Sequence, residues 1–154
     1  MPTSKSIKIL YAEDEPPWQK KIRRILETAG YIVEVASDYA VAHDKFTAES
    51  FDLIVIDLRL GPDVDNRDGQ FLLEDAFKKG IPAIVITGYG TPNTIREAER
   101  LDALRFMHKG SFVIEEFRQA VQEVAAKSDP HIPTPQETEN LKKLLRRVIQ
   151  AYIS

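Results

Sequence analysis

The chain has 154 residues, of which 43% are hydrophobic and 29% are charged, and this length and apolar content suit one hydrophobic core rather than two. Its formal net charge of −3 leaves no basic excess for direct binding to nucleic acid or to an anionic membrane surface. The absence of cysteine excludes disulfides and thiolate metal sites, and no apolar run approaches the ~18 residues of a membrane span, so we expect a soluble cytoplasmic protein.

Five short apolar runs predict the strands of a buried sheet. They occupy residues 7–12, 31–36, 53–56, 83–86 and 105–107. Each is rich in β-branched or aromatic residues and is bounded by polar and turn residues, which is typical of buried strands. Helical patterns separate the runs, so the strands are predicted to be parallel.

The helices between these strands begin and end at recognisable residues. Pro16 and Pro17 suit a first helical turn, where their missing amides need no partner, and Gly30 ends that helix. Ser37 or Asp38 is predicted to cap the second helix. Its core-facing residues are predicted to be Ala42, Phe46 and Ala40. Three further helices are predicted over about residues 70–79, 92–101 and 113–126.

The C-terminal part of the chain is predicted to be a separate element. Residues 128–135 hold three prolines and no helical period, which indicates a linker or a sharp turn. Residues 136–154 form an amphipathic helix whose apolar positions follow the spacing i, i+3, i+4, i+7, i+8 and i+11: Leu141, Leu144, Leu145, Val148, Ile149 and Tyr152. Such a stripe seldom stays in water, so we expect it to be buried against another surface. The first domain is therefore predicted to span residues 1–127.

Polar residues of different chemical kinds follow four of the five predicted strands. Glu13 and Asp14 follow the first, Asp57 the third, Thr87 the fourth and Lys109 the fifth. In an open parallel sheet, groups at the carboxyl ends of the strands converge on one crevice. We therefore expect three carboxylates, a hydroxyl and an ammonium group to meet there.

This set of groups has a chemical logic. Crowded carboxylates repel one another and must shift their pKa values or hold a cation between them. Oxygen ligands from several acids favour a hard ion such as Mg²⁺. A divalent ion and a lysine could neutralise a phosphoryl group carried by one carboxylate, while a threonine hydroxyl bonds one of its oxygens. The pattern predicts a pocket that accepts phosphate on Asp57.

With these residues in this order, the chain resembles the receiver domains of two-component response regulators, the CheY-like superfamily, over about residues 6–127. The resemblance implies an α/β fold: a doubly wound, flavodoxin-like parallel sheet of five strands in the order 2-1-3-4-5. The C-terminal amphipathic helix is an addition to that domain.

The resemblance also implies a role for each residue. Asp57 would be the phosphoacceptor, Thr87 and Lys109 would contact the phosphoryl group, and Phe106 would swing inward with Thr87 as the switch. Mg²⁺ would be held by four residues: Glu13, Asp14, Asp57 and, through its backbone carbonyl, Arg59. The protein would be no enzyme beyond catalysing its own phosphorylation and dephosphorylation.

The partners implied by the family belong to phosphorelay signalling. The donor would be a sensor histidine kinase or a phosphotransfer protein, and the output would be a downstream protein target. A homodimer could form through the C-terminal helix or through the face of the fourth helix and fifth strand. Neither direct nucleic-acid binding nor membrane association is expected.

Two features depart from the family pattern, and three further residues are open to a second interpretation. Glu13 stands where Asp is commoner, and Gly110 follows Lys109 where relatives commonly have a proline, often in a cis peptide. Glu15 lengthens the acidic run, so which two acids matter is open. Phe106 could equally be an ordinary core or surface residue. Trp18 is interpreted as surface packing near the acids.

Two alternative functions remain. A degenerate receiver would act as a phosphorylation-independent protein-binding module, but its sign would be loss of Asp57, Thr87 or Lys109, and all three are present. A haloacid-dehalogenase-like phosphatase also uses an aspartate at a strand end with Mg²⁺. Such enzymes have a second Asp two residues on, where this chain has Arg59, so we rank this alternative far below.

Overall fold

A parallel five-stranded sheet positions every residue discussed below. The structure, a computed structural model, describes residues 6–63, 65–128 and 135–153. The strands are β1 (Lys8–Ala12), β2 (Ile32–Ala36), β3 (Leu53–Ile56), β4 (Ala83–Thr87) and β5 (Arg105–His108). They pair in the order β2-β1-β3-β4-β5, all parallel, which confirms the predicted topology.

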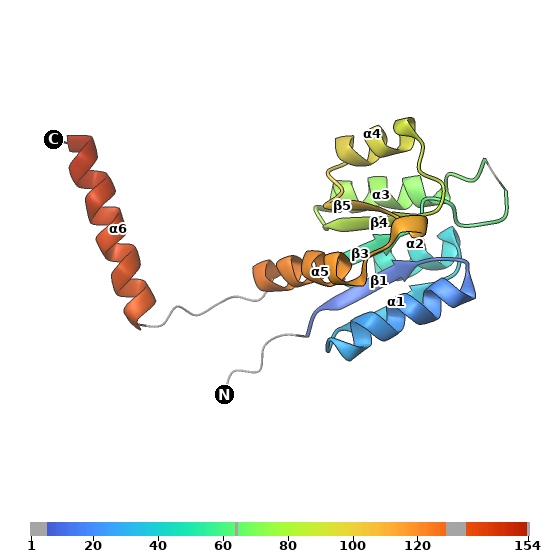
Figure 1. Ribbon diagram of the computed structural model, residues 1–154, viewed down its shortest axis with the longest axis horizontal. Coiled ribbons are helices and arrows are strands. Elements are labelled where there is room, and N and C mark those ends of the chain that lie inside the picture. Colours follow the sequence, from blue (N-terminus) through green and yellow to red (C-terminus); the bar gives the residue numbers. More distant parts are fainter. Residues whose placement is uncertain (1–5, 64, 129–134, 154) are drawn as a thin grey trace.

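Helices cover both faces of this sheet (Figure 1). The covering helices are α1 (Pro16–Thr28), α2 (Tyr39–Ala48), α3 (Asp68–Lys79), α4 (Pro92–Arg100) and α5 (Ile114–Ser128). A further helix, α6 (Pro135–Ile153), follows them in the sequence. The residues of β1 alternate between two cores: Leu10 packs with the residues of α2, α3 and α4, whereas Ile9 and Tyr11 pack with those of α1 and α5. This period of two follows from the strand pleat, and it places side chains two residues apart on the same face.

Two details differ from the sequence-based expectations. Ala40 is exposed, so its predicted place in the core is wrong: it lies two residues from Ala42, and residues so spaced do not share a helix face. Helix α3 begins at Asp68, two residues earlier than predicted. The cause is Asn66, whose Oδ1 accepts hydrogen bonds from the backbone amides of Leu60 and Asp68 and so fixes the approach to the helix.

The C-terminal helix is confirmed as an element, and its predicted apolar stripe is open to solvent. The six stripe residues are each more than half exposed. The predicted linker, residues 128–135, lies almost wholly outside the described residues, so the predicted domain boundaries stay a prediction. Of the helices in the described part of the chain, none combines the length and apolar character needed to cross a membrane.

Gly69, at the start of α3, packs directly against the backbone of Asp57 and Leu58, just after β3. Its amide donates to the carbonyl of Leu58 at 3.2 Å. A Cβ atom built on Gly69 would lie 2.1 Å from the Asp57 carbonyl oxygen and 2.4 Å from Leu58 Cα. These are backbone atoms, so no side-chain rotation relieves the overlap. Glycine is required here by close approach.

We therefore expect Gly69→Ala to lower the free energy of unfolding by about 1–3 kcal/mol, as overpacking does. Helix propensity alone predicts the opposite sign, a gain of roughly 0.5–1 kcal/mol. Urea unfolding measures the change. Gly88→Ala is the matched control, because a Cβ there would come no closer than 3.8 Å to the Lys109 side chain. A Gly69→Ala variant as stable as wild type would contradict the packing argument.

Candidate functional site

The carboxyl ends of β1, β3 and β4 bring the predicted residues together at one edge of the sheet. The parallel register pairs Ala12 with Ile56 and Ile56 with Val85, so the strands end nearly level. Asp57, directly after β3, is fixed by its amide, which donates to the Ala12 carbonyl at 3.0 Å. Thr87 ends β4 and is buried.

The side chain of Asp57 is 1% exposed and both of its oxygens accept hydrogen bonds. Thr87 Oγ1 donates to Oδ1 at 2.8 Å, and the Arg59 amide donates to the same oxygen at 3.1 Å. Lys109 Nζ lies 2.8 Å from Oδ2. The threonine and the lysine predicted to serve Asp57 therefore both reach it, from β4 and from the turn after β5.

Lys109 contacts three carboxylates at once. Its side chain is 9% exposed, and its Nζ lies 2.9 Å from Glu13 Oε2, 2.8 Å from Asp57 Oδ2 and 2.6 Å from Glu15 Oε2. Burial alone would lower the pKa of Lys109, but its hydrogen bonds to Asp57, Glu15 and Glu13 outweigh burial and raise the pKa. The ammonium group therefore stays charged at neutral pH.

Glu13 is fully buried, and both of its carboxylate oxygens are engaged. Oε2 accepts from the Tyr11 hydroxyl at 3.1 Å, and Oε1 accepts from the Glu15 amide at 3.1 Å. Burial and the nearby charge of Asp57 raise the pKa of Glu13 to about 7, although Lys109 opposes the shift. Burial, followed by the charge of Glu13, also raises the pKa of Tyr11, so its hydroxyl keeps the proton that it donates.

Three acids could hold a metal ion at this edge. Glu13, Asp14 and Asp57 each offer a carboxylate oxygen, and these atoms lie within 4.8 Å of one another. An all-oxygen set of carboxylates fits a hard divalent cation. Asp14 is less buried than the other two. Asp14 is the one of the three that is open to solvent, so it is the acid that an incoming ion can reach most directly.

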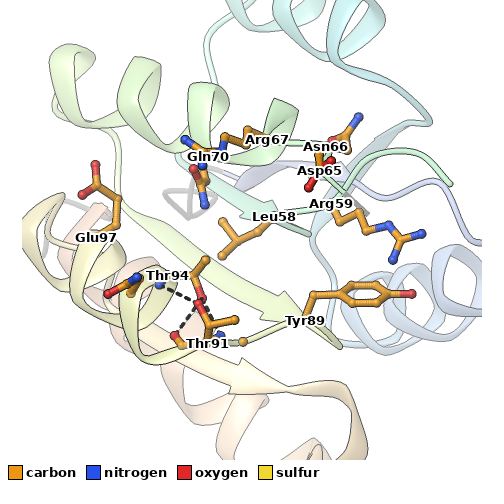
Figure 2. Close-up of a pocket in the computed structure, with 12 residues that line it drawn as sticks. Leu58, Arg59, Asp65, Asn66, Arg67, Gln70, Tyr89, Thr91, Thr94 and Glu97 are labelled. Carbon is orange, nitrogen blue, oxygen red and sulfur yellow. Dashed lines mark hydrogen bonds between the residues drawn. The ribbon is translucent and has the colours of Figure 1, made fainter. Parts of the chain in front are cut away.

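A polar cavity of about 670 Å³ lies beside this group, between the loop after β3 and the start of α4. Figure 2 shows Arg59 and Tyr89 next to each other on its wall. The guanidinium carbon of Arg59 is 4.2 Å from the centre of the Tyr89 ring, a cation–π contact. Arg59 Nε donates to the Gly61 carbonyl at 2.9 Å and its Nη2 donates to the Pro62 carbonyl.

Phe106, the predicted switch residue, lies on β5 and is half-buried. Its ring packs against the core on the side of α2, α3 and α4. The ring also lies against the loop that follows Thr87, because a Cβ on Gly90 would be 3.0 Å from Phe106 Cε1. The described residues contain no cis peptide bond, so the Lys109–Gly110 bond is trans.

Three residues have contacts in this group that are not among the sequence-based expectations. Tyr11 was assigned only to a strand, yet it donates to Glu13; the two stand two residues apart, and strand periodicity could have paired them. Glu15 contacts Lys109 more closely than Glu13 does. Trp18, interpreted as surface packing, has its ring centre 5.1 Å from Lys109 Nζ.

Comparison with known proteins gives a consistent result. A family model described as "Response regulator receiver domain" matches residues 9–122. The chain is 32% identical over 85 residues to the transcriptional regulatory protein CusR of Escherichia coli (strain K12), covering 55% of this chain and 37% of that protein. It is 29% identical over 117 residues to sporulation initiation phosphotransferase F of Bacillus subtilis (strain 168), covering 75% and 90%.

A solved structure resembles the chain over most of its length. It is a CheY-like response regulator receiver domain protein from Methanospirillum hungatei JF-1, with a TM-score of 0.71 and 26% identity. The match covers 80% of this chain and 96% of that one. By contrast, the match to CusR spans only about 37% of the length of that relative.

The buried Glu13 predicts a pH dependence of stability in the metal-free protein. Folding raises the pKa of this acid from 4.5 to about 7, so between these values the folded chain binds more protons than the unfolded chain. The free energy of unfolding should therefore fall as pH rises through this window, and Glu13→Gln should remove about 1–3 kcal/mol of that fall. Urea unfolding at pH 5 and pH 8 measures it.

Glu49→Gln is the control for this measurement. The hydrogen bond from Lys8 lowers the pKa of Glu49, so the stability that it contributes is lost only as pH falls below the window. Its substitution should leave the slope between pH 5 and pH 8 unchanged. If the free energy of unfolding changes with pH equally in wild type and in Glu13→Gln, the raised pKa of Glu13 is contradicted.

Proposed function

This chain belongs to the family of response regulator receiver domains, and on that premise we propose that it takes a phosphoryl group from a histidine kinase or phosphotransfer protein onto Asp57. One observation carries the proposal. Asp57 is a buried carboxylate that Thr87 contacts from the end of β4 and Lys109 contacts from the turn after β5, with further acids beside it. A structural aspartate needs no such set of partners at a strand end.

The residues present suit in-line phosphoryl transfer. An oxygen of Asp57 would form a bond to phosphorus as the phosphorus–nitrogen bond of a phosphohistidine breaks, leaving the electron pair on the imidazole of the donor. Lys109, already 2.8 Å from Asp57 Oδ2, would donate to a phosphoryl oxygen as negative charge develops. Thr87 would turn its hydroxyl from Asp57 Oδ1 to another phosphoryl oxygen.

The donor set also supports Mg²⁺ as the cofactor. Asp14, Asp57 and the backbone carbonyl of Arg59 would hold the ion, with Glu13 acting nearby or through water. When bound, the ion would neutralise charge on the transferred group and on the crowded acids. The side chains would do the rest: Glu13 and Asp57 would orient Lys109, and the Thr87 hydroxyl would hydrogen-bond the phosphoryl group once it is on Asp57.

The output would be a change of surface. Movement of Thr87 toward the phosphoryl group would open space for the Phe106 ring, which now lies against Gly90, and would reshape the face of α4 and β5. That face, or the exposed stripe of α6, could form a homodimer or bind a downstream protein. The acidic chain favours a protein target over direct contact with nucleic acid.

A phosphorylation-independent binding module is the alternative. In such a module, a lysine held at 2.6 to 2.9 Å from three carboxylates would cost free energy of desolvation and serve no purpose in binding. A phosphatase of the haloacid-dehalogenase type would need an acid where Arg59 stands, and Arg59 binds loop carbonyls. Both alternatives therefore account for fewer of the contacts.

Exposure to acetyl phosphate and Mg²⁺ tests the proposal. Intact-mass analysis should show the gain of one phosphoryl group in wild type and none in Asp57→Asn, which keeps the size of the side chain and removes the nucleophile. Asp65→Asn, an exposed acid of the neighbouring loop, is the control and should be modified like wild type. Gel filtration of the same samples tests dimer formation. A folded wild type that gains no phosphate would support the binding-module alternative.

The contact of Arg59 with Tyr89 predicts a long-lived acyl phosphate. Their stacked side chains lie on the wall of the cavity beside Asp57 and would limit the approach of water. Arg59→Ala combined with Tyr89→Ala should therefore speed the loss of phosphate from Asp57 severalfold, measured by intact mass after removal of the donor. Glu97→Gln, another residue of the cavity wall, should leave the rate unchanged. An unchanged rate in the double variant would refute the shielding role.

A further inference from the structure

The ammonium group of Lys109 has more partners than the proposed transfer requires. It has three N–H bonds, and Glu13, Asp57 and Glu15 all lie within 3 Å of its nitrogen. A phosphoryl group arriving on Asp57 needs a donor from Lys109. One of the three existing contacts must therefore be given up.

Glu15 is the partner that can be released. Glu13 is fully buried and is held in addition by Tyr11, and Asp57 is the acceptor itself. The Glu15 side chain is 47% exposed, so water can replace its contact with Lys109 at little cost. Removal of Lys109 from the buried Glu13 would instead leave an unpaired charge in the protein interior.

Glu15 also has a fixed position at the entrance. It directly precedes α1, whose first two residues are Pro16 and Pro17, and these restrict the backbone there. Its amide donates to Glu13 Oε1 at 3.1 Å. The Trp18 ring, in the first turn of the helix, has its centre 5.1 Å from Lys109 Nζ and 5.5 Å from the centre of the Phe112 ring. Glu15 and Trp18 thus border the ammonium group.

We propose that Glu15 is a positioning residue that holds Lys109 before phosphoryl transfer. Through its charge, the pocket binds small anionic phosphodonors more weakly and the metal ion more tightly. The inference rests on the proposed function. Glu15 adds a negative charge beside Glu13, Asp14 and Asp57, which attracts a divalent cation and repels an anionic donor. It also occupies the N–H that the donor phosphate must take.

The proposal predicts two effects of opposite sign for Glu15→Gln, which keeps the shape and removes the charge. The acetyl phosphate concentration for half-maximal phosphorylation should fall about two- to fivefold, and the dissociation constant for Mg²⁺ should rise by about the same factor. The maximal rate should stay within about twofold, since Lys109 keeps Glu13 and Asp57. Damage to the fold would weaken both kinds of binding together.

Trp18 provides the readout for the metal and needs no phosphorylation. It is the chain's one tryptophan, so a fluorescence titration with Mg²⁺ gives the dissociation constant directly. In the metal-free protein, Glu15→Gln should also change the Trp18 emission, because the contact that holds Lys109 beside the ring loses its charge. Glu27→Gln is the matched control: Glu27 lies on the same helix, pairs with the exposed Arg23, and should leave every readout unchanged.

The possible results are distinguishable. A lower half-maximal donor concentration with weaker Mg²⁺ binding supports the role of Glu15. An unchanged or higher donor concentration, or Trp18 emission identical to wild type, overturns it. If wild type gains no phosphoryl group, the proposed function fails; the emission and Mg²⁺ measurements then still decide whether Glu15 holds Lys109.

Discussion

The shared contact of one ammonium group with three carboxylates is the interaction on which the site depends. Lys109 reaches Glu13, Asp57 and Glu15, and Asp14 stands close by, so the negative charges outnumber the positive one. Partly buried charge in this ratio is unfavourable unless a further cation arrives. The pocket therefore carries an excess of negative charge, which a divalent cation beside these acids would offset.

The sheet makes this arrangement tolerable. β3 and β4 are buried along their whole length, and helices cover both faces of the sheet. The strands end nearly level, so groups from distant parts of the sequence meet without long side chains: Thr87 and Asp57 are 30 residues apart and 2.8 Å from each other. A rigid scaffold thus holds reactive groups that would otherwise move apart.

The sequence predicts the fold and the main site residues because both depend on simple patterns. Short apolar runs define the strands, and the residue after each strand falls at the crevice by topology alone. The finer contacts depend on side-chain conformation, which a pattern does not contain. The pairing of Tyr11 with Glu13 and the reach of Glu15 are of this kind. So is the early start of α3, which a single amide side chain, that of Asn66, determines.

The loop between β3 and α3 leaves and returns at nearly one point. The Gly69 amide donates to the Leu58 carbonyl, so the two ends are joined beside Asp57 whatever lies between them. Lengthening a surface loop whose ends are fixed changes its closure entropy only slowly. The acidic residues between them can therefore be exchanged, added or lost without moving the pocket. The tip of this segment can therefore vary in length while Arg59 and Asn66, at its two ends, keep the contacts that matter to the pocket and to α3.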